Sequence, residues 1–131
     1  QKFAPNRTAY DWLSVSTANV DAYLADPLCG GDPTIGLFRK MLGGIAYIEK
    51  AENLKRMNRN TPILFLSGAE DPVGDMGKGV RRAYRSFRRS GVRDVEMKLY
   101  PGARHEILNE AQGETVCADI CRWLEAKLPG R

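Results

Sequence analysis

The second half of the chain alternates strands and helices, and this order most restricts what the chain can fold into. Residues 62–67 are a continuous apolar run, which predicts a strand buried on both faces, as in a parallel sheet. A helix is expected over residues 77–89, an alternating, half-exposed strand over residues 95–100, and a last helix over residues 113–128. The order predicts a βαβα unit with a right-handed crossover, and hence part of an α/β sheet.

The number of predicted strands is small for the length of the chain. A chain of 131 residues is expected to form one domain. Two parallel strands that each have an unpaired outer edge do not make a stable sheet. We therefore interpret the chain as a piece of a larger sheet protein, completed by a missing N-terminal half or by a second chain. Pairing of the exposed edges would also allow a homo-oligomer.

The first 60 residues are predicted to be irregular, with two helices. Residues 19–24 are expected to form a short helix that Asp26-Pro27 ends. Thr34 is a candidate N-cap for an amphipathic helix over residues 35–48, which Gly43-Gly44 weakens in the middle. The charged stretch 49–60 is interpreted as a surface connection.

The composition is that of an ordinary globular protein, with 43% apolar and 27% charged residues. It excludes a disordered acidic tail, and no apolar run approaches the roughly 20 residues that a bilayer span needs. Residues 1–10 contain no apolar signal segment, and the sequence does not begin with Met. The three cysteines, without a CxxC pair, argue against a disulfide framework and favour a reducing, cytoplasmic location.

Three candidate sites are weak. Cys117 and Cys121 have helical spacing, but His105 is the only histidine, so a four-ligand zinc site is not expected. Cys29 has no histidine near it in the sequence, which favours simple burial over a role as nucleophile. Residues 74–79 look like a phosphate loop but fail the Walker A spacing, and are interpreted as a tight turn into a helix.

The net charge of +4 comes from one basic segment, residues 78–93, without which the chain carries more acidic than basic residues. A solvated helix face is the ordinary interpretation. The alternative is a non-catalytic module that binds anionic phospholipid or nucleic acid through this segment. Tyr84 and Phe87 are predicted on the buried stripe, which argues against nucleic acid because no aromatic ring is left to stack on bases. The basic residues are Lys78, Arg81, Arg82, Arg85, Arg88, Arg89 and Arg93.

Asp71 and His105 each lie in the turn that follows a predicted parallel strand. Ligands of open α/β sheets bind beyond the carboxyl ends of the strands, so neighbouring strands would place these two side chains together. A carboxylate beside an imidazole fixes its tautomer and stabilises the imidazolium, which suits a general base. The other interpretation is a turn aspartate and a solvated loop histidine.

The strings around both residues resemble the α/β-hydrolase fold. Residues 66–74, LSGAEDPVG, resemble its acid-bearing turn, and residues 100–106, YPGARHE, resemble its histidine loop. More narrowly, the chain is similar to the serine aminopeptidase S33 and monoacylglycerol-lipase-like branch, often labelled lysophospholipase. The resemblance covers nearly the whole chain. Further strings typical of this branch are residues 11–14, 26–30, 77–80 and 108–110.

The resemblance implies that the chain is the C-terminal portion of an α/β-hydrolase. Residues 1–60 would be the end of a helical cap or lid with its connecting helix. Residues 61–131 would be the last βαβα part of a mostly parallel core sheet. Asp71 would be the acid and His105 the base of a catalytic triad. The nucleophile elbow G-x-S-x-G is absent, so the serine is expected outside this chain, which alone would be inactive.

The activity that the resemblance implies is that of a serine hydrolase cleaving carboxylic esters. Small acyl esters such as monoacylglycerol or lysophospholipid are the expected substrates, although esterases, lipases and some amidases share these strings. No metal or organic cofactor is expected for such a reaction, and no transmembrane segment or nucleic-acid partner is expected either.

Overall fold

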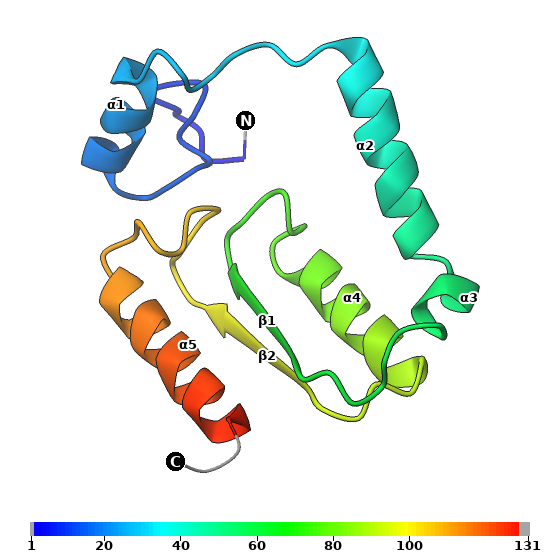
Figure 1. Cartoon of the computed structure of the whole chain (residues 1–131). Helices are drawn as coiled ribbons and strands as arrows, with labels where there is room; N and C mark the ends of the chain where they lie inside the picture. The colour runs from blue at the N-terminus through cyan, green and yellow to red at the C-terminus, as the bar shows by residue number, and fades with distance from the viewer. Residues whose placement is uncertain (1, 129–131) are drawn as a thin grey trace.

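A computed structural model describes residues 2–128 of the chain. Residues 2–60 contain helices but no strand, and the two strands and two further helices follow (Figure 1). The elements are α1 (Thr17–Ala25), α2 (Ile35–Ile48), α3 (Ala51–Leu54), β1 (Ile63–Gly68), α4 (Lys78–Arg89), β2 (Val95–Tyr100) and α5 (Gly113–Lys127).

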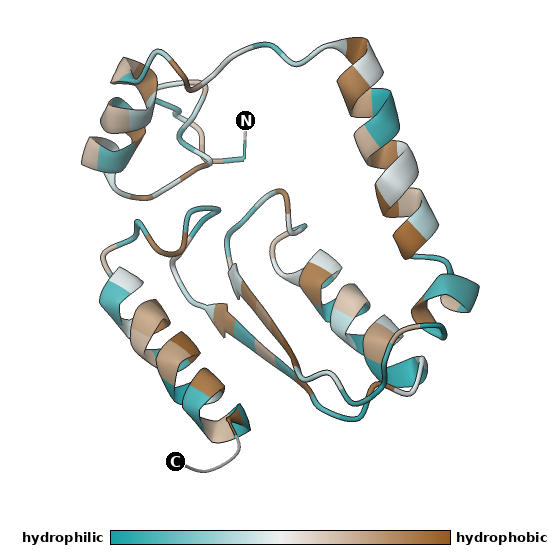
Figure 2. Cartoon of the chain, in the orientation of Figure 1, coloured by the Kyte–Doolittle hydropathy of each residue, from teal (hydrophilic) through white to brown (hydrophobic). Residues whose placement is uncertain are grey.

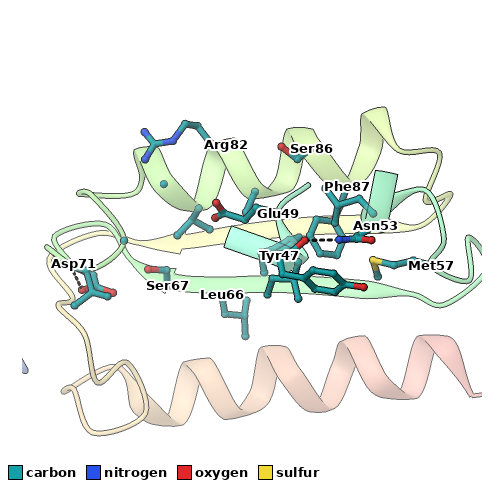
Figure 3. A pocket seen from close by; sticks show the side chains of 18 of the residues that line it. Tyr47, Glu49, Asn53, Met57, Leu66, Ser67, Asp71, Arg82, Ser86 and Phe87 are labelled. Carbon is teal, nitrogen blue, oxygen red and sulfur yellow. Dashed lines mark hydrogen bonds between the residues drawn. The ribbon is translucent and has the colours of Figure 1, made fainter. Parts of the chain in front are cut away.

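The strands β1 and β2 are parallel neighbours, and their register runs from Ile63 opposite Val95 to Gly68 opposite Tyr100. Helix α4 lies on one face of this sheet and α5 on the other (Figures 1 and 3). The predicted order of strand, helix, strand and helix is confirmed, and Gly91, with φ of 92°, ends α4 as a left-handed glycine does. The two strands end at the same edge, so the loops that follow them meet there.

Alternate side chains of β1 pack against different helices, which holds the three layers together. Phe65 meets Phe87 of α4 edge to face, with ring centroids 5.1 Å apart. Leu66 packs on the opposite side, against the buried cluster of Tyr100, Ala103 and Val116. β2 alternates between buried and exposed residues, as its sequence predicts.

β1 is less buried than its apolar sequence predicts. Only Ser67 and Gly68 are buried, while residues 63–66 are half-buried. The physical reason is that the sheet within residues 2–128 has two strands, so one edge of β1 has no neighbour to cover it.

The N-terminal segment and α1 lie against the loop that follows β2, far along the sequence (Figure 1). Ser16 caps α1 by accepting a hydrogen bond from the backbone of Asn19, and Val20 is buried at 2% exposure. Leu13 and Ser14, which precede the helix, are also buried. The residues before α1, which the sequence predicts to be irregular, therefore pack around the loop that follows β2.

Helix α2 stands apart from the sheet, as Figure 1 shows. Thr34 caps it as predicted, and the helix continues unbroken through Gly43-Gly44. None of its residues is buried, although its sequence is rich in apolar side chains (Figure 2). Helix α3 lies within the stretch predicted as a surface connection, and its Leu54 is buried at 7% exposure. The connection is therefore partly anchored by packing.

Candidate active site

The turn after β1 holds Asp71 in a defined orientation. Its backbone N–H donates to Gly68 O at 3.3 Å, and its carbonyl accepts from Met76 N at 2.8 Å. One carboxylate oxygen, Oδ1, accepts from Val73 N at 2.8 Å. Asp71 is only 6% exposed. Its burial and these contacts together hold the other carboxylate oxygen, Oδ2, in one orientation.

The loop after β2 carries His105 to the same edge. Pro101-Gly102 turns the chain, with Gly102 in the left-handed region at φ of 73°. Ala103 closes this turn by donating to Tyr100 O at 3.2 Å, and its side chain is fully buried. The buried alanine fixes the start of the loop, and His105 follows two residues later.

The two loops are joined by backbone hydrogen bonds and by an unusually close approach. Ala69 N donates to Tyr100 O at 2.9 Å, and Glu70 N donates to Ala103 O at 3.0 Å. A Cβ on Gly68 would lie 2.0 Å from the carbonyl oxygen of Arg104, so only glycine fits there. This contact sets the separation between the two loops.

Asp71 and His105 meet through Asp71 Oδ2 and His105 Nδ1, which lie 3.0 Å apart. The carboxylate side chain is 9% exposed, whereas the imidazole is 39% exposed. In the tautomer that donates from Nδ1, the carboxylate orients the ring and Nε2 can accept a proton. The predicted juxtaposition of the two residues is therefore present, with the geometry of a base and its orienting acid.

The N-terminal segment packs against the histidine loop, and the sequence alone did not predict this contact. The Trp12 indole packs on the His105 imidazole with ring centroids 5.1 Å apart. Glu106 N donates to Leu13 O at 2.8 Å, and the Arg104 guanidinium donates to Ser14 O at 3.2 Å. The segment is itself held by a turn in which hydrogen bonds from Thr8 lower the pKa of Asp11.

Glu110 is a second residue that sequence reasoning missed. It is 7% exposed and accepts hydrogen bonds from Ser14 Oγ and from the backbone of Arg104, both at 2.9 Å. The only sequence signal was that it lies in a string typical of the resembled branch. Its partner Ser14 is 96 positions away, and no local pattern reports such a contact.

The serines of the described chain do not bond to His105. Ser14 donates to Glu110, Ser67 to the neighbouring Gly68 carbonyl and Ser90 to Ser86 O. Ser16 is the cap of α1. Residues 2–128 therefore hold the Asp71–His105 pair, but no serine that is hydrogen-bonded to His105.

A cavity of about 1140 Å³ lies beside the Asp71 turn. It is lined by β1, by the sheet-facing side of α4 and by the junction of α2 and α3 (Figure 3). Phe65, Phe87 and Met57 contribute apolar surface, and Asp71 lies at one end. Phe65 and Leu66 lie on opposite faces of β1 and both line this cavity, so the cavity runs along the edge of β1 that has no neighbouring strand in the described chain.

The basic segment forms the solvent face of α4. Arg82 pairs with Asp75 at 3.0 Å, and Arg88 donates to Tyr84 Oη at 3.0 Å. Phe87 packs on the sheet as predicted, so the exposed face is made of arginines. Residues 74–79 close on themselves, with Gly79 N bonded to Gly74 O at 2.9 Å, as a tight turn does.

The cysteines are unpaired thiols. Cys29 is half-buried, and desolvation together with the nearby Asp26 raises its pKa, which disfavours the thiolate. Cys117 and Cys121 are exposed on α5. Within residues 2–128, no group of three or more histidine, cysteine or acidic side chains is arranged to hold a metal ion. In the same range, no helix combines the length and apolarity needed to cross a membrane.

Comparison with known proteins gives consistent matches. The family model described as Serine aminopeptidase, S33 matches residues 1–112. Over 123 residues the chain is 31% identical to a monoacylglycerol lipase of Mycolicibacterium smegmatis, an alignment covering 90% of this chain and 40% of that protein. The chain therefore spans well under half the length of this curated relative.

Solved structures agree on the fold. A thermostable carboxyl esterase from Bacillus coagulans, 26% identical, matches with a TM-score of 0.88 over 95% of this chain and 41% of its own. A monoacylglycerol lipase from Paleococcus ferrophilus, 23% identical, matches with a TM-score of 0.73 over 93% of this chain and 47% of its own. The α/β fold class predicted from the sequence is confirmed.

Proposed function

The chain belongs to the serine aminopeptidase S33 family, and we propose that it supplies the acid and the base of a serine esterase whose nucleophile lies outside residues 1–131. The observation that carries this proposal is the 3.0 Å contact between Asp71 Oδ2 and His105 Nδ1 at the carboxyl end of the sheet. Residues 1–60 would then belong to the cap, and residues 61–131 to the core. The serine would come from a preceding part of the protein or from a second chain.

The proposed reaction is hydrolysis of a carboxylic ester in two steps. His105 Nε2 takes the proton of the serine hydroxyl as the serine oxygen attacks the ester carbonyl, and Asp71 stabilises the imidazolium. The imidazolium gives this proton to the departing alcohol, which leaves an acyl-enzyme. Water then attacks the acyl group, His105 takes a proton from it, and the serine is regenerated as the carboxylic acid departs.

The proposed substrates are small acyl esters such as monoacylglycerol or lysophospholipid. The matched relatives include a monoacylglycerol lipase and a carboxyl esterase, which supports an acyl ester as substrate. The chemistry needs no metal or organic cofactor, and a cytoplasmic location stays a prediction.

Labelling with a fluorophosphonate tests this proposal. The full-length gene product, or the chain with its companion polypeptide, is treated with the probe and analysed by intact-mass spectrometry. We expect one label per active site, on a polypeptide segment other than residues 1–131. His105→Ala and Asp71→Asn should slow labelling by about 10⁴-fold, because the base is lost or held in the wrong tautomer. Equal labelling of these variants and wild type would contradict the proposal.

A second candidate function rests on the solvent face of α4. Its arginines are exposed, and within the described residues Arg82 alone among them forms an ion pair. We propose as the alternative a non-catalytic module that binds an anionic phospholipid surface. Binding to anionic vesicles should then fall steeply as salt is raised, in a protein without esterase activity. Salt-independent binding, or no binding at all, would contradict this alternative.

A further inference from the structure

The carboxylate of Glu110 is buried beside the histidine loop and is held by hydrogen bonds alone. Ser14 Oγ donates to its Oε2 at 2.9 Å, and Val15 N lies 3.1 and 3.2 Å from its two oxygens. Arg104 N donates to its Oε1 at 2.9 Å. Glu110 as a whole is 7% exposed, and no described cation forms an ion pair with it.

These donors come from two stretches of chain that both touch His105. Arg104 is the residue immediately before it, so Glu110 fixes the backbone from which the imidazole projects. Ser14 and Val15 follow Trp12, whose indole packs on the imidazole ring at 5.1 Å. The same carboxylate therefore ties the histidine's own backbone to the segment that covers one side of its ring.

Further hydrogen bonds connect Glu110 and its partner Ser14 to the helices α1 and α5. Ser14 Oγ accepts from Ser16 N at 3.0 Å, so its proton is directed to Glu110, and Ser16 is the N-cap of α1. The carbonyl of Glu110 accepts from Gly113 N at 2.8 Å, at the start of α5. Glu110 thus lies where the N-terminal segment, the histidine loop and α5 meet.

Burying a carboxylate without a cation is unfavourable unless its hydrogen bonds are all made. An apolar side chain could fill the same space, but it could not hold two backbone N–H groups and a hydroxyl in fixed directions. We propose that Glu110 is a positioning residue for His105, which keeps Nδ1 on Asp71 and sets the direction of Nε2. This inference rests on the proposed esterase function.

The expected consequence is a loss of turnover with little loss of substrate binding. Without the carboxylate, Arg104 N, Val15 N and the Ser14 hydroxyl lose their shared acceptor, and the loop can move relative to Asp71. A displacement of about 1 Å in a catalytic group can cost about 100-fold in rate. Glu110 is only 7% exposed and its carboxylate oxygens are occupied by hydrogen bonds, so it is not expected to touch substrate and KM should change little.

The experiment compares four variants in the full-length gene product, of which Ser14→Ala removes the hydroxyl that donates to Glu110. Glu110→Ala removes the acceptor, whereas Glu110→Gln retains one oxygen that can accept from Arg104 N. Glu114→Gln is the matched control, because Glu114 is an exposed acid in the first turn of α5. The measurements are kcat and KM for a short-chain nitrophenyl ester, thermal unfolding, and the proton resonance of the imidazole N–H that faces Asp71.

For Glu110→Ala we expect kcat to fall by about 10- to 100-fold with KM within about two-fold of wild type, and the N–H resonance to broaden or vanish. Glu110→Gln should recover part of kcat, and Glu114→Gln should match wild type. A Glu110→Ala protein that unfolds cooperatively and retains wild-type kcat and resonance would overturn the proposal. If Glu110→Ala does not fold, Glu110→Gln and Ser14→Ala provide the test. A wild-type kcat and a wild-type N–H resonance in both of these variants would overturn the proposal.

Failure of the underlying function has a separate signature. A wild-type protein that neither hydrolyses the ester nor reacts with a fluorophosphonate would refute the esterase assignment. The imidazole resonance would still report whether Glu110 positions His105, because it depends on the contact with Asp71 and needs no turnover.

Discussion

Replacing Gly68 with alanine should separate the loops that bring Asp71 and His105 together. The new Cβ would lie 2.0 Å from Arg104 O and 2.3 Å from Ala103 O, while such contacts are essentially never shorter than 3.0 Å. Both obstacles are backbone atoms, so they cannot rotate away as a side chain could. The histidine loop must therefore retreat by about 1 Å, which is the scale that costs about 100-fold in rate.

The 3.0 Å contact between Asp71 Oδ2 and His105 Nδ1 has little tolerance for such a movement. If the displacement is carried to the ring, the two atoms separate to about 4 Å, where a hydrogen bond no longer exists. Overpacking of this kind also costs about 1–3 kcal/mol in the free energy of unfolding. Activity should accordingly be lost well before the fold is lost.

The assay is kcat for a short-chain ester in the full-length protein, together with thermal unfolding. Gly31→Ala is the matched control, because a Cβ at Gly31 meets nothing within 4 Å and its φ is not in the left-handed region. We expect an approximately 100-fold lower kcat for Gly68→Ala and a wild-type value for Gly31→Ala. A Gly68→Ala enzyme with wild-type turnover would refute the reasoning from loop separation.

Three further predictions concern the core and the sheet. Burial raises the pKa of Tyr100 to about 12, so Tyr100→Phe should remove a phenolate absorbance step near that pH, and an unchanged titration curve would contradict this. Hydrogen bonds from Lys98 and Tyr100 lower the pKa of Asp119 from its ordinary value of 3.8. The ionised carboxylate therefore stabilises the fold above pH 3.8, and this stabilisation is lost as the pH falls through the lowered pKa. Asp119→Asn should flatten this acidic part of the curve of melting temperature against pH. Val116 is fully buried among Tyr100 and Ala103, so Val116→Ala should lower the unfolding free energy by about 2 kcal/mol in a urea titration, and a loss below about 0.5 kcal/mol would refute its place in the core.

The sequence predicts best those elements whose evidence is local. The first strand follows from a continuous apolar run, whereas β2, α4 and α5 follow from apolar periodicity and glycine or proline stops. The structure places all four at almost the predicted residues. The position of Asp71 and His105 beyond adjacent strands follows from the same local order and from the general geometry of parallel sheets.

The parts that the sequence did not predict depend on contacts between distant residues. Ser14 and Glu110 are 96 positions apart, and nothing in the residue type of a glutamate indicates that its carboxylate is buried. Leu54 lies in a charged stretch, so the surrounding composition gives no indication that it is buried. Helix α2 has the predicted amphipathic pattern, but the pattern alone does not show what its apolar side faces.

The contacts between the N-terminal segment and the histidine loop bear on how chimeric enzymes of this family should be made. Residues 11–16 precede α2, which we propose to be part of the cap, yet Trp12, Leu13 and Ser14 all contact the loop of residues 104–110. A chimera that takes its cap from a relative, with a crossover point before residue 11, would replace one side of this contact and retain the other. A crossover placed in the exposed linker between α1 and α2 would exchange the helix while leaving the surroundings of His105 native.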